Sequence, residues 1–477
     1  MQLPQEIKNV LEKLQKAGYE DYVVGGCVRD LIMKREPKDW DITTNAKPEE
    51  IQKIFTDNVY ENEFGTIGIK TESDNPDLAI VEITPYRIEG EYTDKRHPDK
   101  IRFAKTLEED LSRRDFTVNS LAMDTDGEIV DMFSGQNDIK SKTIRTVGKP
   151  EERFSEDALR LLRAVRFATV LEFKIEDKTF AAIKNNAEWL KAISKERIRD
   201  EFIKIIESDN AYDGVLLLEE TGLLQYIIPE LREGIDVGQN LHHIYTVWEH
   251  NTQALRYTAE KKYSLAVRLG ALFHDIGKPR TKRGDGKYST FYGHDVVGGR
   301  MTTEIVERLR FSKDLSEKVI KLVRYHLFYY NVGEVTESSI RRLLVNIGLE
   351  NAEDLIKVRE ADRIGSGRPK AVPYKLRHMK YIIDKVSHDP ISAKMLKISG
   401  EDVMKELEIK PGPKIGLMLN SLLAEVLDDP TKNTKEHLQK RIHELDKKSP
   451  EELKKSLEKI EKAVEEEEKE RMKKYYV

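Results

Sequence analysis

The chain has 477 residues, of which 39% are hydrophobic and 35% are charged, with one cysteine and a formal net charge of −5. Its length exceeds what one hydrophobic core usually holds, about 150 residues per domain, and its single cysteine excludes an internal disulfide. The negative net charge excludes a globally basic nucleic-acid-binding protein, so any contact with RNA must come from local clusters of basic side chains.

The amino-terminal segment, residues 1–6, has neither the basic start nor the apolar stretch of an export signal. No apolar run in the sequence approaches the roughly 20 residues of a membrane-spanning helix. The single cysteine is typical of a reducing compartment. Together these features predict a cytoplasmic protein with no membrane partner, and they do not predict an oligomeric state.

Residues 1–150 mix strand-like and helix-like segments and form the part of the sequence with clear β character. The predicted strands are residues 21–24, 40–43, 65–70, 78–84 and 129–131. From residue 151 onward, apolar residues recur at spacings of three and four, which predicts helices almost throughout. The sequence therefore predicts an α+β fold, with a small mixed-sheet head followed by a mostly α-helical neck, body and tail.

Breaks in the helical pattern divide the second part of the chain. A proline turn at residues 228–230 and a glycine-containing stretch at 234–238 form the first break, and Pro369 with Pro373 forms the next. The charge-laced segment 450–474 is predicted to be a solvated helix. The predicted domains are a head (1–150), a helical neck (151–235), a histidine-rich body (236–370) and a helical tail (371–477).

Two adjacent glycines, Gly25 and Gly26, lie between the predicted strand at 21–24 and a helix-like run at 28–33. Glycines in this position open a helix whose free backbone amides can hold a phosphate group. By itself such a pair more often marks a plain chain reversal. The phosphate hypothesis therefore depends on the acidic residues that follow.

Asp39 and Asp41 are expected on the predicted strand around residues 40–43, where alternate side chains project from one face. Two carboxylates placed in this way can hold magnesium, which prefers oxygen ligands and keeps substrate phosphate oxygens in its remaining positions. An isolated Asp-x-Asp is usually a solvated loop or strand edge. Glu82, in the predicted strand 78–84, is either a third ligand or an ordinary surface residue.

The string at residues 109–119 contains two adjacent arginines, Arg113 and Arg114, followed by an aspartate. It is either a helix start with ion pairs or part of a nucleotide site. A guanidinium fork matches phosphate oxygens in bidentate geometry, so Arg114 is the candidate clamp for a triphosphate.

Asp157 and Arg160 are expected as neighbours on one helix within residues 156–167. They form either an intrahelical ion pair or a pair that contacts a nucleobase. Cytosine and adenine both present an exocyclic amine beside a ring-nitrogen acceptor, which a carboxylate and a guanidinium can match. Uracil and guanine would leave polar groups unpaired, at about 1–3 kcal/mol each.

These strings together resemble the nucleotidyltransferase head of the bacterial-type (class II) tRNA nucleotidyltransferases and poly(A) polymerases, the class that adds the CCA end to tRNA. The resemblance implies attack by the RNA 3′-hydroxyl on the α-phosphate of CTP or ATP, with magnesium at Asp39 and Asp41, a catalytic role for Glu82, and release of pyrophosphate. The nucleotide-binding residues that it implies are Gly26, Arg29, Arg114, Asp157, Arg160, Arg163 and Arg166.

The resemblance also covers two further segments. In the polar stretch 89–105, a family pattern marks a loop that is needed to add the terminal adenosine, which implies that the chain completes CCA. The matching residues are Tyr92, Asp94, Arg96 and Pro98. Residues 195–202 match a family helix that is expected to be structural. The neck, residues 151–235, is expected to select the base and contact RNA, and the tail, residues 371–477, is expected to bind tRNA.

The body contains histidines and aspartates in an order that resembles an HD phosphohydrolase domain, including His274-Asp275 followed by Ile-Gly-Lys. The first-metal ligands that the resemblance implies are His250, His274, Asp275 and Asp362, and the second-metal ligands are His294 and His326. Imidazole and carboxylate ligands suit manganese, nickel, cobalt or iron better than calcium. The resemblance implies cleavage of phosphoesters such as 2′,3′-cyclic phosphates, and the alternative is a purely structural HD fold.

Three functional hypotheses follow, of which CCA addition to tRNA from CTP and ATP is favoured. A poly(A) polymerase shares the same head, but its family has a basic strand after the paired aspartates, and residues 63–68 lack that pattern. The third hypothesis is a metal-dependent phosphohydrolase whose head only binds nucleotide or RNA.

Overall fold

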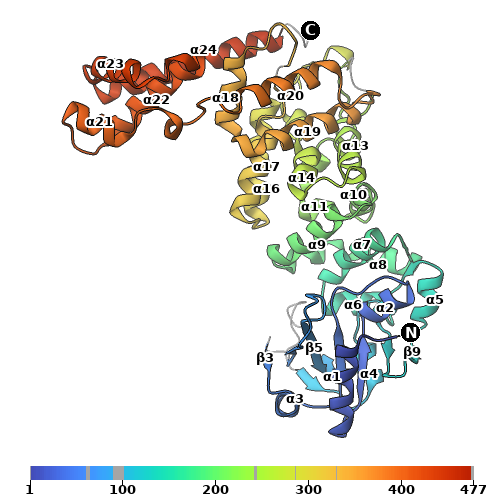
Figure 1. Cartoon of the computed structure of the whole chain (residues 1–477). Coiled ribbons are helices and arrows are strands. Elements are labelled where there is room, and N and C mark those ends of the chain that lie inside the picture. Colours follow the sequence, from blue (N-terminus) through green and yellow to red (C-terminus); the bar gives the residue numbers. More distant parts are fainter. Residues whose placement is uncertain are drawn as a thin grey trace. The chain divides into compact units, whose positions relative to one another are not determined.

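The structure is a computed structural model of the chain, and it describes residues 2–60, 65–89, 101–240, 244–284, 286–328 and 330–473. It divides into two compact units, Met1–Pro229 and Glu230–Val477 (Figure 1). None of the described helices is long and apolar enough to cross a membrane. The residues expected in the adenosine loop, Tyr92, Asp94, Arg96 and Pro98, lie outside the described residues.

The amino-terminal unit contains a mixed sheet. Its described strands are β1 (Asp21–Val24), β2 (Asp41–Thr44), β3 (Asn58–Tyr60), β4 (Ile67–Lys70), β5 (Ile80–Pro85), β8 (Ala122–Met123) and β9 (Ile129–Val130). They lie in the order β3-β4-β5-β2-β1-β8-β9. β2 and β5 are parallel, and the other neighbours are antiparallel. Two short pairs lie beside the sheet, β6 (Arg87–Glu89) with β7 (Ile101–Phe103), and β10 (Thr143–Ile144) with β11 (Lys174–Ile175).

The parallel pairing of β2 and β5 fixes which side chains share a face of the sheet. Parallel neighbours need a crossover connection, which here is formed by the helix α3 (Pro48–Ile54) and the strands β3 and β4. Along β5, Val81 and Ile83 are fully buried, and the alternate residues Glu82 and Thr84 project from the opposite face. Glu82 is therefore directed away from the buried face of the strand.

Helices surround this sheet and continue beyond it in the same unit (Figure 1). They are α1 (Gln5–Lys16), α2 (Gly26–Ile32), α3, α4 (Leu107–Ser112), α5 (Gly135–Lys140), α6 (Pro150–Glu156), α7 (Leu159–Leu171), α8 (Asp177–Asn186), α9 (Lys195–Glu207), α10 (Ala211–Glu220) and α11 (Leu224–Ile227), with 3₁₀ turns η1 (Thr117–Asn119) and η2 (Ala187–Ala192). α7 has a broad apolar surface and packs on α9 and α10.

The regular secondary structure in the described residues of the carboxyl-terminal unit is helical, apart from an isolated bridge between Arg283 and Thr290. Its helices are α12 (Pro229–Arg232, at the boundary), α13 (Val247–Glu260), α14 (Leu265–Phe273), α15 (Lys278–Thr281), α16 (His294–Arg308), α17 (Lys313–Arg324), α18 (Glu337–Ile347), α19 (Ala352–Gly365), α20 (Tyr374–Val386), α21 (Gly400–Leu407), α22 (Pro413–Asp428), α23 (Lys435–Asp446) and α24 (Pro450–Lys473). The 3₁₀ turns are η3 (Gly286–Tyr288), η4 (Leu349–Asn351), η5 (Ala393–Met395) and η6 (Pro430–Lys432).

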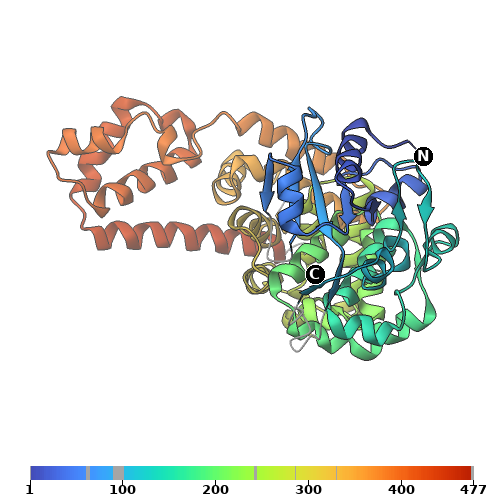
Figure 2. The same ribbon diagram turned by 90° about the horizontal axis from the view of Figure 1, so that it is seen from below.

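Two clusters of described buried residues show how helices of this unit pack. Ala254, Ala271 and Ala361 are buried together where α13, α14 and α19 meet, and such small side chains allow neighbouring helices to approach closely. A second core joins α21 to α24 through residues such as Met418 and Leu422, and Figure 2 shows α24 lying alongside the shorter helices of that group.

The predicted α+β fold is confirmed, with a mixed sheet near the amino terminus and helices elsewhere. The helix expected at 450–474 is α24, and an apolar segment at 415–426 lies within α22. The structure divides the chain into two compact units, and the finer four-domain division stays a prediction.

Candidate active site and metal centre

Gly25 follows β1 and stands directly before α2. Its backbone angles, φ 89° and ψ −134°, are accessible to glycine and strained for any other residue. A Cβ at this position would lie 2.9 Å from Arg114 Nη1 and 3.7 Å from Asp41 Oδ2. The glycine turn, the arginine and the aspartate, which are far apart in the sequence, therefore meet at one place.

Asp41 and Glu82 are brought together by strand register, because they are direct partners across the parallel pair β2 and β5. Both line a cavity of about 430 Å³. The prediction that Asp39 also lies on the strand is wrong, since β2 begins at Asp41 and the exposed Asp39 lies in the bend before it. Asp39 is absent from the residues that line the cavity.

The charge balance at Asp41 favours a bound cation. Burial, opposed by the charge of Arg114 and aided by that of Asp39, raises the pKa of Asp41 to about 6. A divalent cation beside this carboxylate would offset the cost of ionising it, and oxygen donors are what magnesium prefers. The donor set of Asp41 and Glu82, with the charge of Asp39 acting on it, therefore fits magnesium.

A buried carboxylate positions two of the arginines that line the cavity. Asp110 on α4 is fully buried, and it pairs with Arg113 Nη2 at 2.8 Å and with Arg114 Nη2 at 3.5 Å. Burial alone would raise the pKa of Asp110, but the two guanidinium groups hold it below its usual value. The carboxylate thus stays charged and holds both arginines at the cavity that Asp41 also lines.

The prediction that Asp157 and Arg160 lie on one continuous helix is wrong. α6 ends at Glu156 and α7 begins at Leu159, and Asp157 between them has an extended backbone with φ −140° and ψ 105°. The Asp157 carboxylate accepts a hydrogen bond from the Leu159 amide at 3.0 Å. An aspartate that satisfies a free amide at the start of a helix favours such a break over continued helix.

Asp157 and Arg160 both line the cavity, but each is paired with another residue. Arg197 on α9 donates to Asp157 Oδ2 at 2.7 Å. Arg160 Nη1 lies 2.5 Å from Glu156 Oε2, and its Nη2 donates to the Arg113 carbonyl at 3.0 Å. These contacts hold the Asp157 carboxylate and the Arg160 guanidinium at the wall of the cavity that Asp41 also lines.

The predicted residues of the amino-terminal unit separate into two groups. Those that line the cavity are Asp41, Glu82, Arg114, Asp157, Arg160 and Arg163, and those absent from its lining are Asp39, Gly26, Arg29 and Arg166. Arg29 Nη1 donates to Asn119 Oδ1 at 2.6 Å, and Arg166 pairs with Glu201 at 2.9 Å and lies 3.8 Å from the Phe167 ring centroid. Both arginines are thus held among buried groups.

Several polar residues that line the cavity were not predicted. They are Thr66, Thr84, Arg87, Arg113, Asp115 and Arg197. Arg113 and Asp115 flank Arg114, so their place in the same short string was a usable signal. Arg163, which was predicted, reaches Asp115 at 2.6 Å. Thr66 and Arg87 carry no local sequence signal, because β-strand pairing alone brings them to the cavity.

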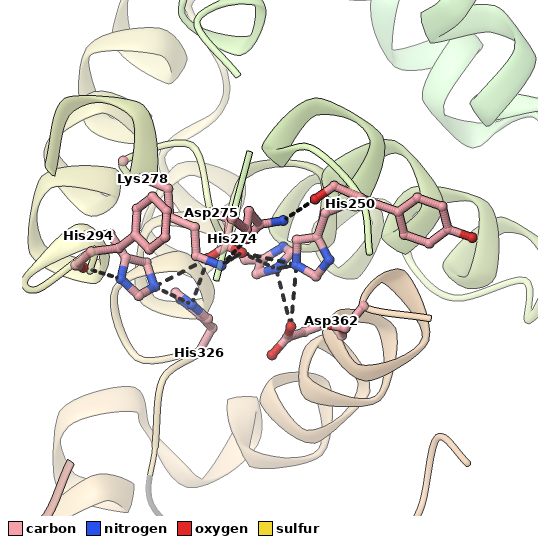
Figure 3. A network of polar contacts seen from close by, with 12 residues as sticks. His250, His274, Asp275, Lys278, His294, His326 and Asp362 are labelled. Carbon is pink, nitrogen blue, oxygen red and sulfur yellow. Dashed lines mark hydrogen bonds and ion pairs between the residues drawn. The ribbon is translucent and has the colours of Figure 1, made fainter. Parts of the chain in front are cut away.

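In the carboxyl-terminal unit, six predicted ligands meet at the centre of the helical bundle (Figure 3). The donor atoms of one group lie within 4.8 Å of one another, as do those of a second group, and Asp275 belongs to both. The first group is His250, His274, Asp275 and Asp362, and the second is Asp275, His294 and His326, all of them buried. Residues from five separate stretches of the chain thus meet around the Asp275 carboxylate.

The imidazole rings are oriented as metal ligands require. In three of them Nδ1 lies 2.7 Å from the backbone carbonyl three residues earlier, so Nδ1 donates to that carbonyl and Nε2 is directed into the cluster. The three are His274, His294 and His326. Nε2 of His250 lies only 2.8 Å from Nε2 of His274, and Nε2 of His294 lies 3.2 Å from Asp275 Oδ1.

A buried cation lies against the cluster. Lys278 Nζ is 2.5 Å from Asp275 Oδ2 and 2.6 Å from Gln239 Oε1. Burial alone would lower the pKa of His274, but the Asp275 and Asp362 carboxylates raise it to about 9. The carboxylates thus attract positive charge into this space, and the nitrogen and oxygen donors fit manganese, nickel, cobalt or iron.

Three matches to protein families cover much of the chain. Residues 21–145 match the "Poly A polymerase head domain", residues 172–235 match the "Probable RNA and SrmB- binding site of polymerase A", and residues 299–442 match the tRNA nucleotidyltransferase domain 2 family.

Two curated relatives are similar over almost their whole length. The CCA-adding enzyme of Ligilactobacillus salivarius is 34% identical over 91% of this chain and 96% of its own length. The CCA-adding enzyme of Enterococcus faecalis is 32% identical over 91% of this chain and 95% of its own length. The chain belongs to the family of CCA-adding enzymes. The crystal structure of the Bacillus stearothermophilus CCA-adding enzyme in complex with CTP is similar in fold, with a TM-score of 0.67 and 26% identity over 93% of this chain and 97% of that one.

Membership of the CCA-adding enzyme family confirms the resemblance to tRNA nucleotidyltransferases. It also explains why the head is shared with poly(A) polymerases, since the head family carries their name. The roles of the individual site residues stay predictions, which rest on the contacts described above.

Proposed function

We propose that this chain adds CCA to the 3′ end of tRNA from CTP and ATP without a nucleic-acid template. One observation carries the proposal. The carboxylates of Asp41 and Glu82, the Arg114 guanidinium, and the Asp157 and Arg160 side chains all line a single cavity. Groups for metal binding, phosphate binding and base contact are therefore within reach of one nucleotide.

The chemistry follows from the charges at this cavity. The RNA 3′-hydroxyl oxygen bonds to the α-phosphorus, and the bond from that phosphorus to the oxygen bridging the β-phosphate breaks, releasing pyrophosphate. Magnesium, held by Asp41 and Glu82 with Asp39 nearby, would supply activation of the hydroxyl and neutralisation of the leaving charge. Arg114, fixed by Asp110, is positioned to contact the triphosphate oxygens.

Base choice is assigned to Asp157 and Arg160. A carboxylate accepts a hydrogen bond from the exocyclic amine of cytosine or adenine, and a guanidinium donates to the neighbouring ring nitrogen. Arg197 holds the Asp157 carboxylate through an ion pair of 2.7 Å, so the acceptor is oriented before a base arrives. Uracil and guanine present a carbonyl to that carboxylate, and each unpaired group would cost about 1–3 kcal/mol.

The test is incubation of tRNA lacking CCA with labelled nucleotides and magnesium, sized on a gel. CTP alone should extend the RNA by two nucleotides, and CTP with ATP by three. A poly(A) polymerase would instead make long tails from ATP and ignore CTP. Asp41→Asn protein, prepared in parallel, controls for contaminating activity.

A second function, hydrolysis of a phosphoester at the HD cluster, is favoured by the two ligand groups that share Asp275. A bound transition metal would supply an activated water. Chelated protein should be reloaded with manganese, nickel, cobalt or iron and assayed on 2′,3′-cyclic nucleotides. Metal-dependent hydrolysis that Asp275→Asn abolishes supports this function, and its absence with every metal leaves the structural HD fold. The cytoplasmic location stays a prediction.

A further inference from the structure

α20 presents an exposed aromatic face. Tyr374, His378 and Tyr381 follow one another at helical spacing, with successive ring centroids 6.4 Å apart. Tyr374 is 64% exposed and Tyr381 is 63% exposed. The opposite face of the helix supplies the packing contacts, through the buried residues Leu376, Met379, Ile382 and Val386. The tyrosine rings are therefore not needed to fill the core.

The same helix is locally basic within an acidic chain. α20 contains four lysine or arginine residues and one aspartate, whereas the whole chain has a net charge of −5. Arg377 is exposed beside the aromatic face, and Lys385 on that face pairs with Glu337. Aromatic rings interleaved with basic side chains are typical of surfaces that bind nucleic-acid strands.

The aromatic face leads to the cavity that holds the HD cluster. Tyr374 and Lys375 line this cavity together with Asp275 and His326, and its volume is about 1590 Å³. That volume exceeds the roughly 300–1,000 Å³ of an ordinary small-molecule site. Five arginines line it against three aspartates, two of which belong to the metal cluster. The arginines are Arg324, Arg342, Arg359, Arg363 and Arg368. Three of the arginines are paired with carboxylates, Arg324 with Asp295, Arg359 with Asp362 and Arg342 with Asp428, so phosphates would meet Arg363 and Arg368 first.

We propose that α20 and this cavity form one binding surface for a single-stranded RNA segment. Bases stack on Tyr374 and Tyr381, and phosphates lie beside Arg377 and beside Arg363 and Arg368 of the cavity. Stacking suits RNA because every base has an aromatic face. An acidic peptide would pair with the basic side chains and would not need the exposed tyrosine rings. The inference requires neither nucleotidyl transfer nor hydrolysis, so it goes beyond the proposed function.

The test uses the full-length protein and a fluorescently labelled single-stranded RNA of about eight nucleotides, a length typical of such sites, with anisotropy read at several salt concentrations. The Tyr374→Ala/Tyr381→Ala variant should bind at least about tenfold more weakly with an unchanged salt dependence, because stacking involves no counterion release. The Tyr374→Phe/Tyr381→Phe variant should bind like wild type. Arg377→Gln should reduce the slope of log affinity against log salt by about one.

Matched controls separate this result from misfolding. Tyr288→Ala removes a tyrosine that is 75% exposed in the same unit and does not line the cavity, so it should leave binding unchanged. Unchanged thermal unfolding and an unchanged circular dichroism spectrum of the double alanine variant show that it is folded.

Three outcomes would overturn the proposal. They are no binding of single-stranded RNA, equal binding by wild type and the double alanine variant, and equally tight binding of duplex RNA or polyglutamate. Wild-type protein that binds the single-stranded RNA but does not add CCA would count against the proposed function alone.

Discussion

The two candidate sites gather charged groups by different means. In the amino-terminal unit, strand register places Asp41 beside Glu82, and arginines from the loop after α4, from α7 and from α9 complete an open cavity. In the carboxyl-terminal unit, buried imidazoles and carboxylates from helices and helix ends converge on Asp275. The first arrangement leaves room for a nucleotide, and the second brings donor atoms within bonding reach of an ion before any ion arrives.

This difference teaches which partner completes each site. The cavity of the amino-terminal unit contains paired arginines and carboxylates whose charges are already balanced in part, as in the pairing of Arg114 with Asp110. The HD cluster crowds ring nitrogens against each other, with Nε2 of His250 and His274 only 2.8 Å apart. We therefore expect the first site to respond mainly to nucleotide and the second mainly to metal.

Disabling each site alone tests whether the two sites act separately. Asp41→Asn removes a predicted magnesium ligand and should lower CCA addition at least about a hundredfold, as loss of a key electrostatic group commonly does. Asp275→Asn should abolish metal binding by the HD cluster and leave CCA addition within about twofold, because the variant changes no group of the nucleotide cavity. Gel extension assays and metal content after dialysis measure the two effects.

If Asp275→Asn lowered CCA addition as strongly as Asp41→Asn does, the two sites would not act separately. Thermal unfolding of both variants is the control for folding, since Asp275 also balances the buried Lys278.

The next effect concerns base choice in the open cavity. Asp157→Ala removes the acceptor for the exocyclic amine, and the loss of one such hydrogen bond, about 1–3 kcal/mol, should reduce CTP incorporation roughly 5–150-fold. The preference for CTP over UTP should fall by a similar factor, because the variant no longer penalises a carbonyl. Single-turnover incorporation with each nucleotide measures both.

Arg197→Met should give a smaller loss in the same direction, since the Asp157 carboxylate remains and only its orientation is released. Arg199→Gln is the matched control, because Arg199 lies on the same helix, pairs with Asp200 and does not line the cavity. Unaltered selectivity in Asp157→Ala protein would remove Asp157 from the base contact.

A smaller effect is expected at Gly25, the turn residue that lies close to Arg114 and Asp41 of the open cavity. Gly25→Ala introduces a Cβ that would meet Arg114 Nη1 at 2.9 Å, so it should raise KM for CTP and ATP by displacing that guanidinium. Backbone strain at positive φ should also lower the free energy of unfolding by about 1–3 kcal/mol. Steady-state kinetics and denaturant unfolding separate the two consequences.

Gly18→Ala supplies the control for strain, because Gly18 has φ 87° and a Cβ there would meet nothing within 4 Å. It should lower stability comparably and leave KM unchanged. Equal KM values for the two variants would mean that the close approach of Gly25 to Arg114 has no part in nucleotide binding.

Sequence reasoning reached the parts of both sites that depend on local signals. The strand at 21–24, the glycine turn and the helix after it follow from short-range backbone preferences, and they agree with β1 and α2. The HD ligands were found through their resemblance to a family, because residues more than a hundred positions apart carry no local signal of their meeting.

What could not be predicted depends on long-range pairing. That Glu82 lies beside Asp41 follows from the register of β2 with β5, which a single sequence does not specify. The break at Asp157 was missed because the apolar periodicity continues through it. Arg197 was expected to be structural because residues 195–202 match a family helix. Its ion pair with Asp157 spans 40 residues and therefore leaves no local signal in the sequence.

The smallest expected effect tests whether a raised carboxyl pKa by itself identifies a residue of the nucleotide cavity. Asp21 at the start of β1 resembles Asp41 in that burial raises its pKa to about 6, against 3.8 in an exposed chain, but it does not line the cavity. The native state therefore favours the protonated form, so its stabilising contribution is complete below about pH 4 and is lost as pH rises through about 6. Asp21→Asn should raise the thermal midpoint at pH 7.5, leave it nearly unchanged at pH 4, and leave CTP kinetics unaltered, whereas the exposed control Asp126→Asn should shift neither midpoint. A changed KM for CTP in Asp21→Asn protein would show that this carboxylate acts on the nucleotide cavity. The list of cavity-lining residues would then no longer separate carboxylates that affect nucleotide binding from those that only support the sheet.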